Sequence, residues 1–297
     1  MSQVKNGKAF EHAVAAALAS SLKLDIFQDS SARFAKECFE TRSPSLRARF
    51  LTAAKIAVDH IFILERGAIT QGGHVLIAGD ALGQAGDVRD VLISQTNLGI
   101  SCKANHEAFK HPRLSFTSDF VSRWGLNQDG CSNEYWGAVR PIFEELKRIK
   151  NSSSGQVLWK DLINVTDTYY KTVLDAFEKE LTRVSSSDPE GVAVALLKYI
   201  IGRKDFYKVI AKRDHVEIQA FNLDGKLSSK RTKLPKKILG IDELDGGPNS
   251  RTVRFDGGWT FNFRIHSASS RVEPSLKFDI QAVALPPSLY KHHIAFD

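Results

Sequence analysis

Apolar residues recur at helical spacing in two segments near the start of the chain, residues 8–22 and residues 45–67. Spacing of three or four positions gathers apolar side chains on one face of a helix. In the first segment the positions are Phe10, Val14, Ala17, Leu18 and Leu22. The pattern predicts a helix in each segment, with Gly67 ending the second. Glu11 falls on or beside the apolar face of the first helix, an unusual place for a carboxylate.

Short apolar runs bounded by polar turns predict strands in both halves of the chain. The runs are residues 74–78, 87–93, 98–103, 206–211, 215–221, 259–266 and 276–285. Further helical patterns lie at residues 135–149, 160–184 and 189–201. Helices followed by mostly antiparallel strands, without a repeating strand–helix–strand unit, predict an α+β fold. The polar stretch 151–155 predicts a boundary between two lobes, residues 1–151 and residues 152–297.

The composition is that of a globular protein with a substantial core. Of 297 residues, 42% are hydrophobic and 25% are charged. No apolar run approaches the ~18 residues that a membrane span needs, and the first residues lack the apolar segment of a secretory signal. The three cysteines form no closely spaced pair. We therefore expect a cytoplasmic protein that keeps its cysteines reduced.

Positive charge is concentrated in one segment of the second half. Residues 198–237 hold twelve Lys or Arg and four Asp or Glu, a net charge of +8 in a chain whose total is +7. A basic segment on a nearly neutral body is typical of a surface that binds a polyanion. A solvated charged face without a partner is an equally good interpretation of the charge alone.

Two apolar runs carry charge where a buried strand rarely does, Asp90 in the first and Lys103 in the second. A buried ion costs several kcal/mol unless it is paired or bound to a metal. Because the runs form a hairpin, we expect the two side chains to meet, with Ser101 on the face of Lys103. A carboxylate beside a lysine suits metal-assisted phosphodiester hydrolysis, to which Glu11 could add a second carboxylate. Reserve carboxylates are Asp87 and Glu107.

Each of these residues also has a purely structural interpretation. The run around Asp90 could be a salt-bridged strand edge, Glu11 an exposed helix residue, and Lys103 a side chain that extends to solvent from a strand end. His106 and His111 flank Lys110, where phosphate contact is favoured over a histidine-based catalytic site. Cys102 is expected to be a small core residue.

Four blocks of the sequence together resemble the PD-(D/E)XK nuclease superfamily and, more narrowly, the type II restriction endonucleases of the HaeIII family. The blocks are residues 7–11, 86–93, 99–115 and 263–279. The resemblance implies a restriction-endonuclease-like core in residues 1–151 and a mixed helix and antiparallel-strand region for target recognition in residues 152–297.

The resemblance also assigns residues. It implies Asp90 as a metal ligand, Lys103 as the motif lysine and Glu11 as the first-helix glutamate. Ser101 stands where the motif has its middle acid, so Glu107 or Glu11 would have to replace that carboxylate. The expected DNA contacts are His106, Lys110, His111, Arg113, Arg264, Ser269, Ser270, Arg271 and Lys277.

The family implies a Mg²⁺-dependent enzyme that cuts double-stranded DNA at a short palindromic, GC-rich (GGCC-like) site. It further implies a homodimer, since the symmetry of a palindrome mirrors that of a dimer, and a companion DNA methyltransferase of the same specificity. Two alternatives remain open: a catalytically silent DNA-binding module on the same fold, which Ser101 makes plausible, and a repair or structure-specific nuclease.

Overall fold

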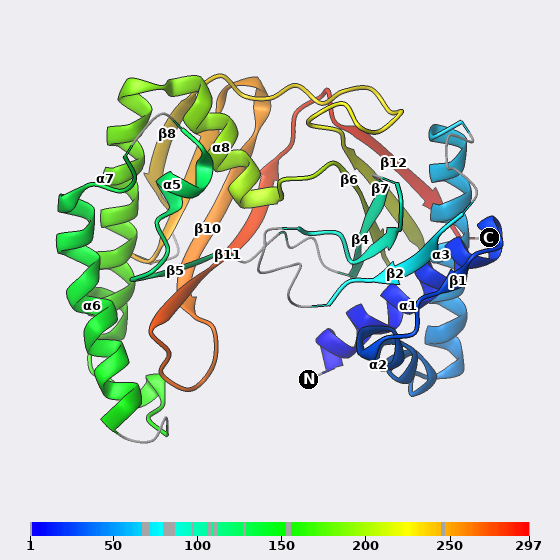
Figure 1. The fold of residues 1–297 in the computed structure, drawn as a ribbon, viewed down its shortest axis with the longest axis horizontal. Coiled ribbons are helices and arrows are strands. Elements are labelled where there is room, and N and C mark those ends of the chain that lie inside the picture. Colours follow the sequence, from blue (N-terminus) through cyan, green and yellow to red (C-terminus); the bar gives the residue numbers. More distant parts are fainter. Residues whose placement is uncertain are drawn as a thin grey trace. The chain divides into compact units, whose positions relative to one another are not determined.

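The chain forms two compact units in a computed structural model (Figure 1). The first unit comprises residues 1–107, 202–233 and 286–297, and the second comprises residues 108–201 and 234–285. The structure describes residues 2–66, 72–79, 87–96, 98–105, 109, 112–126, 129–152, 156–244 and 247–296.

The two units differ from the contiguous lobes expected on either side of residue 151. Helix α6 (Asn133–Ser152) ends one residue beyond that position, inside the polar stretch 151–155. Strands from the second half of the chain also pair with strands of the first half in one sheet.

The first unit is built on a seven-stranded sheet of order β1-β2-β3-β4-β6-β7-β12. Its strands are β1 (Asp25–Ile26), β2 (His74–Ile77), β3 (Val91–Ile93), β4 (Gly99–Ala104), β6 (Phe206–Ala211), β7 (His215–Phe221) and β12 (Tyr290–Ala295). The β1–β2 and β4–β6 pairs are parallel and the other pairs are antiparallel. The helices of this unit are α1 (Ser2–Leu22), α2 (Ser30–Glu40) and α3 (Pro44–Leu64).

Helices α1 and α3 supply the apolar layer that holds this sheet. Phe10 and Phe50 are both fully buried, and their ring centroids lie 5.3 Å apart. The same core includes Ile100, Cys102 and Ala104 of β4. Because side chains alternate along a strand, Ser101 and Lys103 point to the opposite face of the sheet. The core position of Cys102 is as expected.

The second unit pairs a five-stranded antiparallel sheet of order β5-β11-β10-β9-β8 with helices. Its strands are β5 (Arg113–Ser115), β8 (Ile238–Glu243), β9 (Ser250–Phe255), β10 (Thr260–Ser267) and β11 (Ser275–Ala284). Besides α6, its helices are α5 (Phe120–Trp124), α7 (Thr172–Ser187) and α8 (Pro189–Ile201). Short helical turns cover Trp159–Asp161, Thr166–Lys171 and Asp256–Gly258. With the first unit, this arrangement confirms the α+β class.

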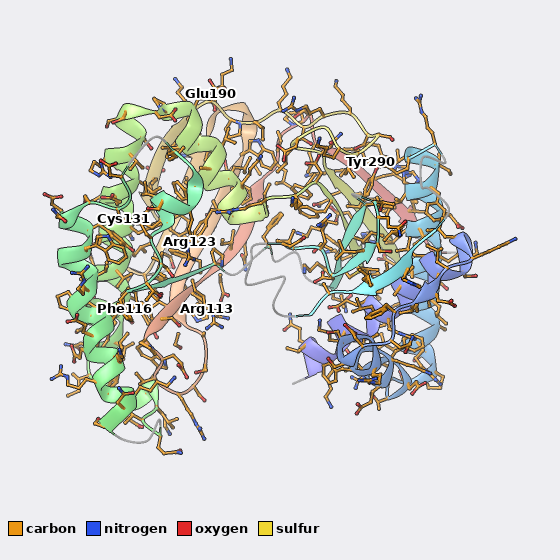
Figure 2. All side chains as sticks on the ribbon, in the orientation of Figure 1. Arg113, Phe116, Arg123, Cys131, Glu190 and Tyr290 are labelled. Carbon is orange, nitrogen blue, oxygen red and sulfur yellow. The ribbon has the colours of Figure 1, made fainter. Side chains whose placement is uncertain are left out.

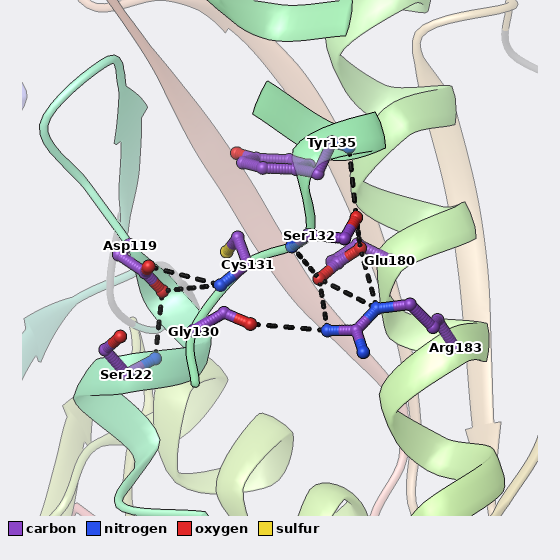
Figure 3. Close-up of polar contacts among 8 residues, drawn as sticks. All are labelled: Asp119, Ser122, Gly130, Cys131, Ser132, Tyr135, Glu180 and Arg183. Carbon is purple, nitrogen blue, oxygen red and sulfur yellow. Dashed lines mark hydrogen bonds and ion pairs between the residues drawn. The ribbon is translucent and has the colours of Figure 1, made fainter. Parts of the chain in front are cut away.

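Two carboxylates fix the segment between α5 and α6 (Figure 3). Asp119 accepts hydrogen bonds from the backbone N–H groups of Ser122 and Cys131. Glu180 of α7 accepts from the N–H and hydroxyl of Ser132 and pairs with Arg183 at 2.7 Å. The bond to Ser122 satisfies an N–H in the first turn of α5, and the others satisfy N–H groups of the two residues that precede α6. Ser132 is thereby tied to α7 through Glu180.

Several predicted elements are confirmed, and two differ from the prediction. The strand predicted over residues 87–93 is shorter, because β3 begins only at Val91. Strands β6 and β7 have the predicted bounds, and α8 runs from Pro189 to Ile201 as expected. The continuous helix predicted over residues 160–184 is wrong, because Asn164 adopts a left-handed conformation (φ 50°) that interrupts it. The helix α3 ends with Glu65 as its C-cap, and Gly67 lies outside the described residues. Within the described residues, no helix is both long and apolar enough to cross a membrane.

Glu65 ties the end of α3 to β6 and to the segment that follows β7. Its carboxylate accepts a 2.6 Å hydrogen bond from the hydroxyl of Tyr207 and further bonds from the N–H and hydroxyl of Ser228. Replacing Glu65 by Ala leaves the buried tyrosine hydroxyl without an acceptor. We expect the free energy of unfolding, measured by urea titration, to fall by about 1–3 kcal/mol.

The matched variant Tyr207→Phe removes the hydroxyl itself, so no buried donor is left without an acceptor. We therefore expect a smaller fall in the free energy of unfolding, of about 1 kcal/mol. Equal stability of Glu65→Ala and the wild-type protein would contradict this role for the carboxylate.

Candidate active site

Asp90 lies where strands β3 and β4 separate. The antiparallel pairing of these strands joins Val91 to Ile100 and Leu92 to Gly99 and goes no further. Beyond that point the Cys102 N–H donates a 2.7 Å hydrogen bond to Oδ2 of Asp90 instead of to a β3 carbonyl. The backbone of Asp90 is itself held, since its N–H donates to Ile100 and its carbonyl accepts from Ala78. The Asp90 carboxylate is therefore fixed by the sheet.

Two side chains of β4 converge on the same carboxylate oxygen. Ser101 Oγ lies 3.2 Å from Asp90 Oδ2, and Lys103 Nζ lies 3.4 Å from it. The hairpin thus brings Asp90 and Lys103 together, as the sequence predicted. Lys103 keeps 18% of its side-chain surface exposed, so its ammonium retains access to a ligand. The Ser101 hydroxyl acts as a hydrogen-bond donor to the acid.

Glu11 is a buried carboxylate on α1, as the helical pattern predicted, with an exposed fraction of only 5%. Burial, followed by the negative charge of Asp90, raises its pKa to about 7. Lys8, whose Nζ lies 2.9 Å from Oε2 of Glu11, acts in the opposite direction, as does Lys103. The negative charge of Asp90 therefore adds to burial in disfavouring the ionised form of Glu11, and a bound cation would favour that form.

The carboxylate of Asp87 is bound by Arg89 and not by the lysine of the site. Its carboxylate accepts from the backbone N–H of Arg89 at 3.1 Å and from the guanidinium at 2.8 and 2.6 Å. Although burial alone would raise its pKa, the hydrogen bonds and charge of Arg89 lower the pKa of Asp87. Of the two aspartates, Asp90 is the one that faces Lys103.

The carboxylates present suit a divalent cation that binds oxygen ligands. Glu11 and Asp90 offer two acidic groups in a partly buried setting, and such a cation needs only one or two protein carboxylates. Within the described residues, no cluster of three or more His, Cys, Asp or Glu side chains is placed to hold a metal ion. Glu107, the other proposed replacement for the middle acid, lies outside the described residues.

Two basic residues near the site escaped sequence-based prediction. Lys8 pairs with Glu11 one turn earlier on α1. Lys208 of β6 is 1% exposed and lies in register with Ser101 of the neighbouring strand. A lysine inside the apolar run 206–211 is the same signal that identified Lys103, and it would have marked Lys208 as well.

The expected DNA contacts that can be placed belong to the second unit. Arg113 of β5, labelled in Figure 2, lies opposite Lys277 of β11, and Arg264 lies on the adjacent strand β10. Ser269, Ser270 and Arg271 are exposed in the connection between β10 and β11. This connection is held by backbone hydrogen bonds to residues 157–159. His106, Lys110 and His111 lie outside the described residues.

Comparison with known proteins identifies the family. The sequence model of the HaeIII restriction endonuclease family matches residues 7–286. A curated relative from Haemophilus aegyptius, "Type II restriction enzyme HaeIII", is 34% identical over 308 aligned positions that cover 96% of this chain and 95% of the relative. No solved structure matches the chain. Both matches confirm the family that the sequence motifs indicated, and the chain therefore belongs to the HaeIII restriction endonuclease family.

Proposed function

We propose that this protein is a Mg²⁺-dependent endonuclease that hydrolyses phosphodiester bonds of double-stranded DNA at a short palindromic, GC-rich site. The observation that carries the proposal is the arrangement of Asp90, which the sheet holds in place beside Lys103 and within the electrostatic reach of Glu11. Family membership supports the class of reaction. The GGCC-like target is what the resemblance to this family implies.

We assign the first unit to the PD-(D/E)XK nuclease core. Its support is a mixed sheet in which the motif acid and lysine come from adjacent strands, with a glutamate on the first helix. Ser101 replaces the middle acid of the motif. We propose that Glu11 takes the place of this missing acid beside Asp90, with Glu107 as a further metal ligand.

Each residue of the site has a distinct role in the proposed hydrolysis. Asp90 and Glu11 would hold Mg²⁺, which supplies positive charge to the phosphoryl oxygens and lowers the pKa of a bound water. Lys103 donates hydrogen bonds from a fixed cation, and thereby orients the attacking water and stabilises the charge that develops at phosphorus. Ser101 and the Cys102 N–H keep Asp90 in its orientation. Hydrolysis forms one bond from water oxygen to phosphorus and breaks one bond from phosphorus to a sugar oxygen.

DNA binding is assigned mainly to the second unit and to the residues that lead into it. The proposed contacts are His106, Lys110, His111, Arg113, Arg264, Ser269, Ser270, Arg271 and Lys277. Two copies of the chain would match a palindromic site as a homodimer. A methyltransferase of the same specificity would protect host DNA, and both proteins would act in the cytoplasm.

The decisive experiment is digestion of a sequenced plasmid with Mg²⁺ and with EDTA, followed by sequencing of the fragment ends. Discrete Mg²⁺-dependent fragments that share one short motif would establish the activity and its specificity together. Intact plasmid in both samples with retained DNA binding would support the silent DNA-binding module. Cleavage that follows branched or damaged structure would support the repair nuclease.

Replacing Asp90 or Lys103 by Ala should lower the cleavage rate at least about 100-fold, because either change removes charge stabilisation at the reacting phosphate. DNA binding, measured by gel shift in Ca²⁺, should largely survive.

Asp87→Asn is the matched control, because Asp87 pairs with Arg89, whereas Asp90 is the aspartate that pairs with Lys103. The variant should cut at close to the wild-type rate. Parental rates for both Asp90→Ala and Lys103→Ala would refute the assignment of the site.

The pKa of Glu11 predicts how stability depends on pH. A folded-state pKa of about 7 against an ordinary value of 4.5 means that burial favours the protonated acid. The resulting stabilisation is fully present below the ordinary value and is lost as pH rises through 7. In EDTA, unfolding of the wild-type protein should therefore become easier between about pH 5 and about pH 8, by up to about 3 kcal/mol relative to Glu11→Gln.

Glu40→Gln, a change of the same type at an exposed position of α2, should follow the wild-type pH profile. Adding Mg²⁺ at the higher pH should stabilise the wild-type protein more than Glu11→Gln. Parallel pH profiles for wild-type and Glu11→Gln would exclude a buried protonated acid at this position.

A further inference from the structure

The sheet of the second unit has one apolar face and one polar face. Phe263 of β10 and Phe278 of β11 pack against Phe177 of α7, with ring centroids 6.4 and 5.2 Å from it. Side chains alternate along strands, so the intervening residues of β10 and β11 project from the face opposite the helices. On these strands the intervening residues are Asn262, Arg264, His266, Lys277, Asp279 and Gln281.

Asp279 lies at the centre of a cluster of basic side chains on this polar face. Its Oδ2 is 3.4 Å from Nη2 of Arg264, directly opposite in register, and 2.6 Å from Nε2 of His266. Its Oδ1 is 3.6 Å from Nζ of Lys277. Arg113 adds a further positive charge beside Lys277 on β5. One carboxylate therefore faces three basic side chains, and the cluster stays positive overall.

The exposed fractions of these side chains form a gradient. Arg264 is 56% exposed, Asp279 33% and His266 22%. The guanidinium of Arg264 is thus more exposed than the carboxylate of Asp279, which contacts it from the adjacent strand β11. Exposed ion pairs of this kind contribute little to folding stability. A guanidinium that is held in place, however, loses less conformational freedom when it binds a ligand.

The chemistry of the cluster favours base edges of duplex DNA as its ligand. Positive charge attracts the polyanion, and the base edges in the major groove present hydrogen-bond acceptors to such a surface. The planar fork of an arginine matches the O6 and N7 acceptors of guanine, whereas a phosphate contact needs no fixed orientation.

We propose that Arg264, held by Asp279, reads a guanine of the recognition sequence from the polar face of β10 and β11. Arg264 contacts the base, and Asp279 is a positioning residue that sets the direction of the guanidinium. The inference rests on the proposed function, since it concerns how the same enzyme selects its site.

The test compares cleavage of the motif found by plasmid digestion with cleavage of duplexes that carry one altered base pair each. Asp279→Asn should lower discrimination at one G·C pair by about tenfold or more, the size expected for loss of one bidentate base contact. Arg264→Lys, which keeps the charge but loses the fork, should lower discrimination at the same base pair. Misfolding reduces cleavage of every duplex alike and does not move this ratio.

Asp242→Asn is the matched control. Asp242 of β8 pairs with Arg254 of β9 at 2.8 Å, an exposed acid–arginine pair on a different pair of strands of the same sheet, and its loss should leave discrimination unchanged. Unchanged ratios for both Asp279→Asn and Arg264→Lys, or an equal loss on all duplexes, would overturn the inference while the proposed function stands. A wild-type protein that cuts no DNA would overturn the proposed function and this inference with it.

Discussion

The candidate site depends on one hydrogen bond, from the Cys102 N–H to the Asp90 carboxylate. At the point where β3 and β4 separate, this N–H has no acceptor on β3, and a buried amide without an acceptor would cost about 1–3 kcal/mol. The carboxylate therefore completes the sheet and is fixed in place by it. In the proposed assignment, the side chain that completes the sheet is also the one that would hold the metal ion.

The same bond clarifies what Ser101 contributes. A carboxylate at position 101 would add a negative charge beside Asp90, in a field that already raises the pKa of Glu11. The hydroxyl instead donates to Asp90 and leaves the described site with two acids rather than three. In the proposed assignment, Glu11 on α1 supplies the carboxylate that the usual motif places on the strand.

Sequence patterns predicted which charged side chains come together better than they predicted the compact units. Asp90, Lys103 and Glu11 were predicted to meet because charge in an apolar run is costly, a local rule that needs no knowledge of topology. Strands β8 and β12 were missed, because these edge strands contain no buried residue and lack the apolar alternation that marks a strand. That each unit is built from segments distant in the sequence was also missed, because this arrangement is set by pairings between residues far apart in the chain.

The path of the chain has a consequence for how the enzyme is made. Strand β4 pairs with β6 only after about a hundred intervening residues, and β12 joins the sheet after a further stretch of chain that belongs largely to the second unit. Long-range parallel pairing is slow and cannot precede synthesis of both partners. On the ribosome the sheet of the first unit thus stays incomplete until Tyr290–Ala295 has been synthesised. Asp90 and Lys103 are made long before the sheet that carries them can be completed.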